Sequence, residues 1–186
     1  PIFSANKLKG VDHVLGPEMK STGEVLGLGL TYEEALSKAL FSKGNPFSLQ
    51  SKKSFLLSVT GRDKEGVLPI AEKLIKNGFE LIATEGTAKY LNNQHVSTVK
   101  YNEKYFSDDL IAGAIVIPTQ GRNLSRKGAQ LRELCTRYQI PCFTCLDTAM
   151  AGLAIETPTT DYRSMNTYYS FETERKGSYA TNNSTI

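Results

Sequence analysis

The sequence of 186 residues contains no tryptophan, two histidines and three cysteines. No apolar run approaches the roughly 18 residues that a membrane span needs, and the first ten residues, PIFSANKLKG, lack the charged-then-apolar pattern of a secretory signal. We therefore expect a cytoplasmic protein that does not bind membranes. Because the chain begins with proline rather than methionine, we also expect it to be part of a longer chain.

Neither sign of charge dominates. The 22 basic and 19 acidic residues give a net charge of +3, which is too mild to predict nucleic-acid binding, and no run of five or six like charges occurs. The hydrophobic fraction of 40% and the charged fraction of 22% are typical of a globular protein.

The cysteines give no disulfide framework, because Cys135, Cys142 and Cys145 are odd in number and irregular in spacing. Cys142 and Cys145 form a C-x-x-C pair, which leaves a redox motif open. The flanking Ile140 and Phe143 favour a buried strand instead, where cysteine behaves as a small apolar residue. Since there is no second ligand pair and neither histidine lies nearby, we expect no metal site.

Three zones follow along the chain. Residues 1–48 are rich in glycine, then form a helix over 31–40 with a capping box that begins at Thr31. Residues 49–156 alternate between strands and helices, and residues 157–186 form a polar tail without periodicity, which predicts a flexible or loosely docked segment. Within the second zone we expect strands at 54–59, 79–84, 96–100, 114–119 and 140–144, and helical segments at 65–78, 87–94, 107–113, 125–139 and 147–156.

Five short apolar strands separated by helices are typical of a parallel sheet covered on both faces. The sequence therefore predicts an α/β fold with a five-stranded parallel sheet in a three-layer αβα arrangement. Ligands of such sheets bind outside the carboxyl ends of the strands.

The turns at that edge carry hydroxyls and cations. Thr84 and Thr87 flank Gly86 in the sequence ATEGT, where a strand becomes a helix. A helix N-terminus offers free N–H groups and a partial positive charge, threonine adds directed donors, and glycine lets an anion approach. The other turns contribute Thr60, Arg62 and Lys64 after strand one, Lys100 and Lys104 after strand three, Thr119, Gln120 and Arg122 after strand four, and Thr144 after strand five.

Together these residues predict a phosphate-binding edge. Taken alone, each threonine is better explained by a plain helix cap, and Lys64 by a solvated surface lysine; only the joint pattern favours a phosphate site. No Ser-His-Asp order, Walker loop or long glycine fingerprint occurs, so we expect no catalytic residue in this chain.

Two longer stretches resemble one family. Residues 10–29, GVDHVLGPEMKSTGEVLGLG, strongly resemble the end of the second ATP-grasp unit in the large chain of carbamoyl-phosphate synthetases. Residues 56–91, LLSVTGRDKEGVLPIAEKLIKNGFELIATEGTAKYL, resemble the start of the methylglyoxal-synthase-like domain that ends the same large chain. The resemblance covers residues 1 to about 156 and implies an ATP-grasp edge over 1–48 and a regulatory domain over 49–156.

The resemblance implies a role in a glutamine-hydrolysing ligase of pyrimidine and arginine synthesis. The whole large chain makes carbamoyl phosphate from bicarbonate, ammonia and two ATP with Mg or Mn, and a small glutaminase subunit supplies the ammonia. This piece would carry no cofactor and no catalysis. Its domain would bind an effector such as UMP, IMP or ornithine, and self-association through the domain is left open.

The family motifs match this sequence residue by residue. Departures occur at Ile117 and Pro118, where nucleotide-regulated members carry asparagine and threonine, and at Cys142, where a tyrosine helps to hold ornithine. The resemblance therefore implies phosphate binding more firmly than nucleotide specificity, and leaves Thr144 as the remaining residue of a doubtful ornithine site. The matched effector-phosphate residues are Lys64, Thr84, Gly86, Thr87, Lys100 (with Lys104 as a competitor), Thr119 and Arg122.

Three alternatives stay open. A free-standing methylglyoxal synthase would need a glycine-rich loop with a catalytic aspartate after the third strand, where this chain reads KYNEKYFSDD. The cyclohydrolase domain of purine synthesis shares a similar start but lacks the GPEMKSTGEV segment. A docking or oligomerisation module of the same large chain, without any ligand, would use the sheet edge for association.

Overall fold

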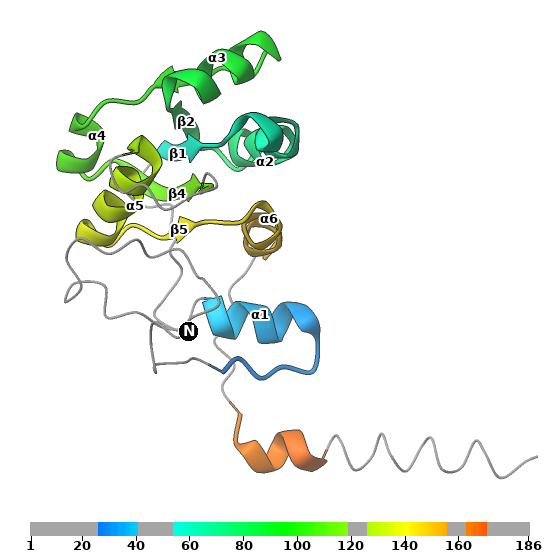
Figure 1. Cartoon of the computed structure of the whole chain (residues 1–186). Helices are drawn as coiled ribbons and strands as arrows, with labels where there is room; N and C mark the ends of the chain where they lie inside the picture. The colour runs from blue at the N-terminus through cyan, green and yellow to red at the C-terminus, as the bar shows by residue number, and fades with distance from the viewer. Residues whose placement is uncertain (1–25, 41–53, 119–125, 156–162, 171–186) are drawn as a thin grey trace, which may run out of the picture. The chain divides into compact units, whose positions relative to one another are not determined.

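A computed structural model of the chain describes residues 26–40, 54–118, 126–155 and 163–170 (Figure 1). These residues belong to two compact units. The larger unit contains the described residues 54–118 and 126–155, and the smaller unit contains residues 26–40 and 163–170. The domain boundaries expected near residues 48 and 156 lie outside the described residues and stay predictions.

The larger unit is built on one five-stranded sheet in which every pairing is parallel. The strand order is β3-β2-β1-β4-β5, so the first strand lies at the centre. This confirms the predicted α/β fold with a five-stranded parallel sheet. The strands are β1 (Ser54–Ser58), β2 (Glu80–Ala83), β3 (Val99–Lys100), β4 (Ile111–Val116) and β5 (Cys142–Phe143).

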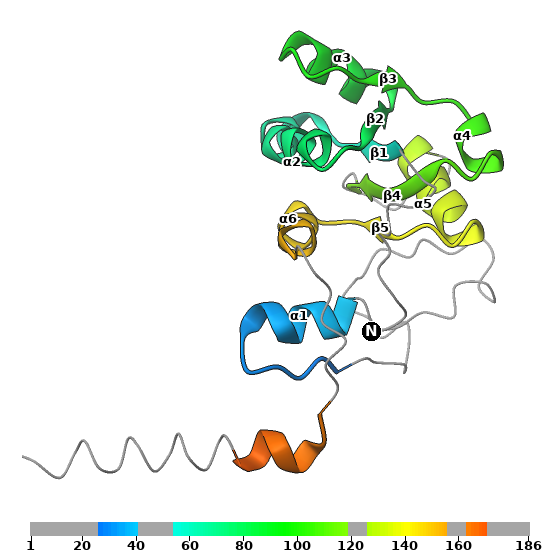
Figure 2. The ribbon, with the colours of Figure 1, turned by 180° about the vertical axis from the view of Figure 1, so that it is seen from behind.

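Helices cover both faces of this sheet (Figures 1 and 2). One face packs against α2 (Lys64–Lys76), α3 (Glu85–Asn93) and α6 (Leu146–Ala154), and the other against α4 (Lys104–Ser107) and α5 (Lys127–Arg137). A short 3-10 helix, η2 (Gly61–Asp63), leads into α2. The predicted three-layer arrangement is therefore present in the described part of the chain.

Burial of β1 explains its continuous apolar sequence. Phe55 and Leu57 belong to the core cluster under α2, α3 and α6, while Leu56 belongs to the cluster under α4 and α5. All three side chains are fully buried, because a central parallel strand faces protein on both sides. Phe55 also packs edge-on against Phe79, with 5.6 Å between the ring centroids.

The sequence-based assignment of a helical turn at 107–113 is wrong. Helix α4 already ends at Ser107, and Asp109 turns the chain with a φ of 52°. Ile111 then begins β4, which is buried along its whole length and ends at Val116 rather than at Thr119. The apolar residues after Asp109 therefore stabilise the strand by burial, which outweighs the weak helical signal of a short segment.

In the smaller unit, helix α1 (Tyr32–Leu40) begins with the predicted cap. The Glu34 N–H donates to Thr31 Oγ1 at 3.2 Å, and the Leu30 N–H donates to Glu34 Oε2 at 2.8 Å. Two backbone donors at the helix start are thereby satisfied, as in a capping box. Glu34 Oε1 also pairs with Lys38 Nζ at 2.6 Å.

The tail expected to be flexible contains a helix at residues 165–170. Its Tyr168 hydroxyl donates to the Leu28 carbonyl at 3.1 Å and accepts from Lys38 Nζ at 2.7 Å. These contacts dock the described part of the tail within the smaller unit, and a contact between residues 130 positions apart has no local sequence pattern. In the part of the chain that the structure describes, no helix is long and apolar enough to cross a bilayer.

We predict that Phe55→Ala lowers the free energy of unfolding by about 3–5 kcal/mol, because it leaves a cavity in a closed core. The matched control is Ile75→Ala on α2, where the side chain is 43% exposed and the loss should stay below about 1 kcal/mol. Urea unfolding of both variants measures the difference. Equal losses would contradict the assignment of β1 to the centre of the sheet.

Candidate functional site

The turn between β2 and α3 is joined to the end of β1 by buried hydrogen bonds. The Thr84 N–H donates to the Leu57 carbonyl at 3.2 Å. Thr87 Oγ1 accepts from the Val59 N–H at 3.1 Å and lies 3.4 Å from the Val59 carbonyl, to which it donates. Thr87 is only 1% exposed, so its hydroxyl holds the two neighbouring loops together at the carboxyl edge of the sheet.

Thr84 occupies the N-cap position of α3, but its side chain does not cap the helix. Its hydroxyl instead lies 3.3 Å from the hydroxyls of Ser58 and Thr87. The plain-cap alternative predicts a bond from this hydroxyl to a backbone N–H of the first turn, which is missing. Thr84 is half-buried, and it is the threonine of the pair that remains within reach of a ligand.

Space is open in front of the first turn of α3. A Cβ added to Gly86 would meet no heavy atom within 4 Å, and Gly86 does not have a positive φ. No described neighbour therefore requires glycine here. Room beside N–H groups at a helix start is the arrangement that an anion needs.

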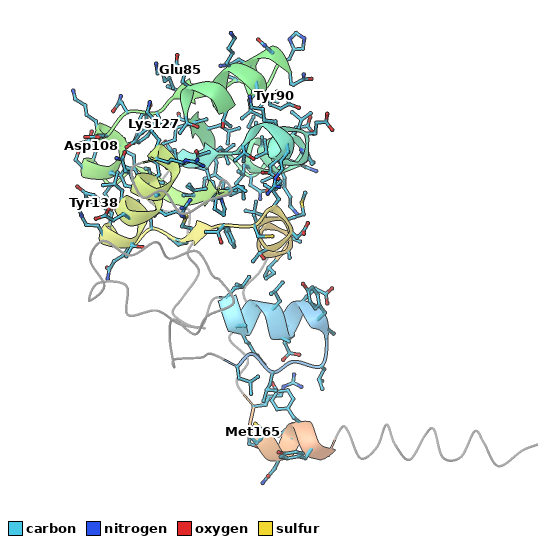
Figure 3. All side chains as sticks on the ribbon, in the orientation of Figure 1. Glu85, Tyr90, Asp108, Lys127, Tyr138 and Met165 are labelled. Carbon is cyan, nitrogen blue, oxygen red and sulfur yellow. The ribbon has the colours of Figure 1, made fainter. Side chains whose placement is uncertain are left out.

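Lys64 leans from the start of α2 toward α3. Its Nζ lies 5.6 Å from the centroid of the Tyr90 ring, and the residue is half-buried. Figure 3 shows Tyr90 on the α2 side of α3. A cation over an aromatic face is held in place at modest energy, so Lys64 brings a positive charge to the helix that starts with the ATEGT turn.

Lys100, at the end of β3, pairs with a carboxylate of the same turn. Its Nζ lies 3.0 Å from Glu85 Oε2, and the two side chains are 66% and 71% exposed. The hydrogen bond to Lys100 lowers the pKa of the Glu85 carboxyl. An ion pair this exposed stabilises the fold little. The competing Lys104 begins α4.

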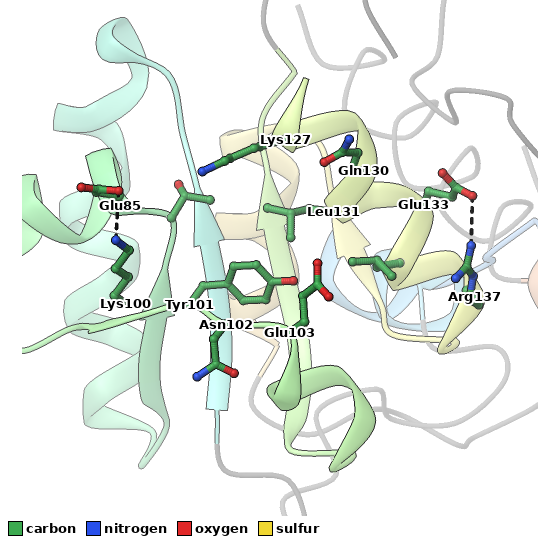
Figure 4. A pocket seen from close by; sticks show the side chains of 12 residues that line it. Glu85, Lys100, Tyr101, Asn102, Glu103, Lys127, Gln130, Leu131, Glu133 and Arg137 are labelled. Atoms are coloured by element: carbon green, nitrogen blue, oxygen red, sulfur yellow. Dashed lines mark hydrogen bonds and ion pairs between the residues drawn. The ribbon is translucent and has the colours of Figure 1, made fainter. Parts of the chain in front are cut away.

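A cavity of about 630 Å³ opens beside this turn, between the β3–α4 loop and α5 (Figure 4). Of the residues predicted from the sequence, Thr84 and Lys100 line it, whereas Lys104 does not. The structure adds residues that the sequence analysis missed: Glu85, Tyr101, Asn102, Glu103, Lys127, Gln130, Leu131, Glu133, Leu134 and Arg137.

The α5 residues that line this cavity could have been identified from their spacing in the sequence. Lys127, Gln130, Glu133 and Arg137 recur at intervals of three or four, which places them on one face of the helix. Because a helix after a parallel strand starts at the carboxyl edge, this polar face was a candidate lining. Opposite α5, burial and the Glu103 carboxylate raise the pKa of the Tyr101 hydroxyl.

The remaining predicted residues lie apart from this cavity. Lys64, Gly86 and Thr87 do not line it, although the Thr84–Thr87 contact joins their turn to it. Thr144 follows β5, is half-buried and also does not line the cavity. Thr119 and Arg122 lie outside the described residues.

The three cysteines differ in burial. Cys142 packs against the cluster that contains the fully buried Cys135, while Cys145 is exposed at the start of α6. A hydrogen bond with Cys142 and burial raise the pKa of the Cys135 thiol, which makes it a poor nucleophile. Among the described residues, no group of three histidine, cysteine or acidic side chains could hold a metal.

Comparison with known protein families gives a match within the larger unit. A family model described as "MGS-like domain" matches residues 66–144, which run from α2 to the end of β5. The chain contains an MGS-like domain. The MGS-like domain thus accounts for four of the five strands, and the remaining strand, β1, directly precedes it.

Curated relatives extend the similarity beyond the MGS-like domain. The chain is 40% identical over 157 residues to the "Carbamoyl phosphate synthase large chain" of Thermoanaerobacter sp. (strain X514) and, equally, to that of Thermoanaerobacter pseudethanolicus (strain ATCC 33223 / 39E). Each alignment covers 82% of this chain and 14% of the relative. The chain therefore matches about one seventh of the length of these relatives.

We predict that Thr87→Val lowers the free energy of unfolding by about 1–2 kcal/mol, because the Val59 N–H loses its acceptor. Thr87→Ser is the matched control: it keeps the oxygen and loses one methyl group, so its cost should stay below about 1 kcal/mol. Amide hydrogen exchange at Val59 should accelerate in the valine variant and not in the serine variant. Unchanged exchange in Thr87→Val would contradict the structural role of this hydroxyl.

Proposed function

We propose that this chain is the regulatory part of a carbamoyl phosphate synthase large chain, in which the MGS-like domain binds a phosphate-bearing effector such as UMP or IMP. The observation that carries the proposal is the 40% identity to carbamoyl phosphate synthase large chains over a segment that includes an MGS-like domain. The effector site is the carboxyl edge of the parallel sheet.

The geometry of that edge supports an anion site. Thr84 presents a half-buried hydroxyl that does not cap its own helix, and the space beside Gly86 is open. Lys64 is held against the same helix by Tyr90, and Lys100 reaches the turn from β3. Hydroxyls, free N–H groups and lysines gathered near one turn can bind phosphate by charge-assisted hydrogen bonds.

The whole synthase supplies the chemistry in this proposal. It makes carbamoyl phosphate from bicarbonate, glutamine-derived ammonia and two ATP in the cytoplasm, for pyrimidine or arginine synthesis. A small glutaminase subunit and the rest of the large chain are the partners, and ATP with Mg or Mn binds outside this piece. An ornithine site at Thr144 is a weaker part of the proposal, because Cys142 cannot replace a tyrosine hydroxyl.

A ligand-free docking or oligomerisation module is the second candidate. It is favoured by the ion pair of Lys100 with Glu85 and by the internal bonds of Thr87. Both satisfy, within the chain, groups that a ligand would otherwise use. In that case the sheet edge contacts protein, and no phosphate-bearing probe binds it.

We predict that Lys64→Ala weakens the binding of UMP or IMP by about 1–2 kcal/mol, the scale of one charge-assisted hydrogen bond. Lys76→Ala, at the other end of α2, is the matched control and should leave the affinity unchanged. Calorimetric titration of the two variants with UMP and IMP, and with ornithine in parallel, measures the effect. If Lys64→Ala binds as tightly as the unaltered chain, Lys64 is a surface residue only.

We further predict that this chain alone turns over neither ATP with bicarbonate nor dihydroxyacetone phosphate. The reason is that no catalytic set is present in its sequence, and the ATP-grasp units lie elsewhere in this proposal. Coupled assays for ADP release and for methylglyoxal formation measure the two activities. Turnover of dihydroxyacetone phosphate would favour a free-standing methylglyoxal synthase instead.

A further inference from the structure

The charged side chains that line the cavity beside α5 fall into two groups. Lys100 pairs with Glu85 at 3.0 Å, and Arg137 Nη2 pairs with Glu133 Oε1 at 3.3 Å. Within the described ranges, the side chains of Lys127 and Glu103 make neither an ion pair nor a hydrogen bond. One cation and one carboxylate therefore remain for a ligand.

Lys127 supplies the positive end of the cavity. It is the first residue of α5, and its charge contributes to lowering the pKa of Glu85, so the two side chains are close. Figure 4 shows Lys127 extending from α5 toward the side on which Glu85 and Lys100 lie. Thr84 lines the same cavity, so a phosphate here meets a lysine and lies beside a threonine that can donate a hydrogen bond.

Glu103 supplies a carboxylate, which carries the opposite charge, to the same cavity. Its carboxylate lies beside Tyr101, whose hydroxyl points toward it in Figure 4. The neighbouring amide of Asn102 has its carbonyl oxygen occupied by the Lys104 N–H at 2.9 Å. An ionised carboxylate only accepts hydrogen bonds and repels a carbonyl oxygen. A ligand that reaches Glu103 must therefore present hydrogen-bond donors there, and an amino group supplies them.

We propose that this cavity selects a phosphate-bearing ligand whose other end carries an amino group: Lys127 binds the phosphate, and Glu103 accepts hydrogen bonds from the amine. This inference rests on the proposed function and, among phosphate-bearing effectors, favours those with an amino group over UMP and IMP, whose bases carry carbonyl groups. The volume of about 630 Å³ is in the range of small-molecule sites. Since glutamate accepts from the exocyclic amine of cytosine, an aminated base fits Glu103 better than a base with a carbonyl group at that position.

The experiment compares CMP with UMP, which differ by an amino group in place of a carbonyl oxygen. In calorimetric titrations of the whole chain we expect CMP to bind about tenfold more tightly than UMP, a factor that one added hydrogen bond to a charged group supplies. Glu103→Gln should lower the affinity for CMP about tenfold and raise rather than lower that for UMP, because the glutamine amide can donate to the carbonyl oxygen of the base. Lys127→Gln should weaken both nucleotides about tenfold.

Lys76→Gln is the control, because this lysine ends α2 and does not line the cavity; it should change neither affinity. Equal binding of CMP and UMP, or a Lys127→Gln variant that binds both as before, overturns the inference. If the inference is overturned but Lys64→Ala still weakens the binding of both nucleotides, the proposed effector site stands and only the roles given to Lys127 and Glu103 are wrong. If neither nucleotide nor inorganic phosphate binds the unaltered chain, the effector site and this inference fall together.

Discussion

Parallel pairing of the central strand constrains the whole larger unit. β1 is hydrogen-bonded in parallel to β2 on one side and to β4 on the other, so the carboxyl ends of these strands meet at one edge. Each strand must then be followed by a crossover whose helix starts near that edge. The starts of α2, α3 and α5, and with them Lys64, Thr84 and Lys127, are gathered there by backbone hydrogen bonding. Substitutions in the loops can change what this edge binds without changing where it lies.

The two threonines of the ATEGT turn show how one motif divides its roles. Thr87 is buried and bonded to Val59, so it shapes the edge before any ligand arrives. Thr84 is half-buried and bonded only to other hydroxyls, which can rotate. A hydroxyl that can exchange its hydrogen-bond partners can bind a ligand at little cost in folding stability. A hydroxyl that satisfies a backbone N–H cannot, because that N–H would lose its acceptor. In the proposed effector site, the motif therefore supplies a scaffold residue, Thr87, and a candidate contact residue, Thr84, on one helical turn.

Much of this organisation could be predicted from the sequence, because strands that are buried on both faces are continuous apolar runs. Phe55 to Leu57 and Leu81 to Ala83 are such runs, and both were assigned correctly. Ile111 was assigned to a helical turn because the polar residues before it resemble a helix start, and only the burial of β4 decides otherwise. Lys127 and Glu103 were missed as site residues because the prediction considered loop hydroxyls and cations directly after strands. Tyr168 depends on a contact 130 residues away, which no local pattern encodes.

The strength of the ion pair between Lys100 and Glu85 determines whether a ligand can reach Lys100 at the carboxyl edge of the sheet. Both side chains are mostly exposed, and an ion pair this exposed stabilises the fold little. A contact from a lysine to a phosphate is charge-assisted as well, so a phosphate can displace the carboxylate without a large loss in the stability of the fold. The displaced Glu85 carries its charge into solvent, where it costs little. Screening of these exposed charges by salt weakens both the internal pair and the ligand contact, so binding at the proposed effector site depends on ionic strength.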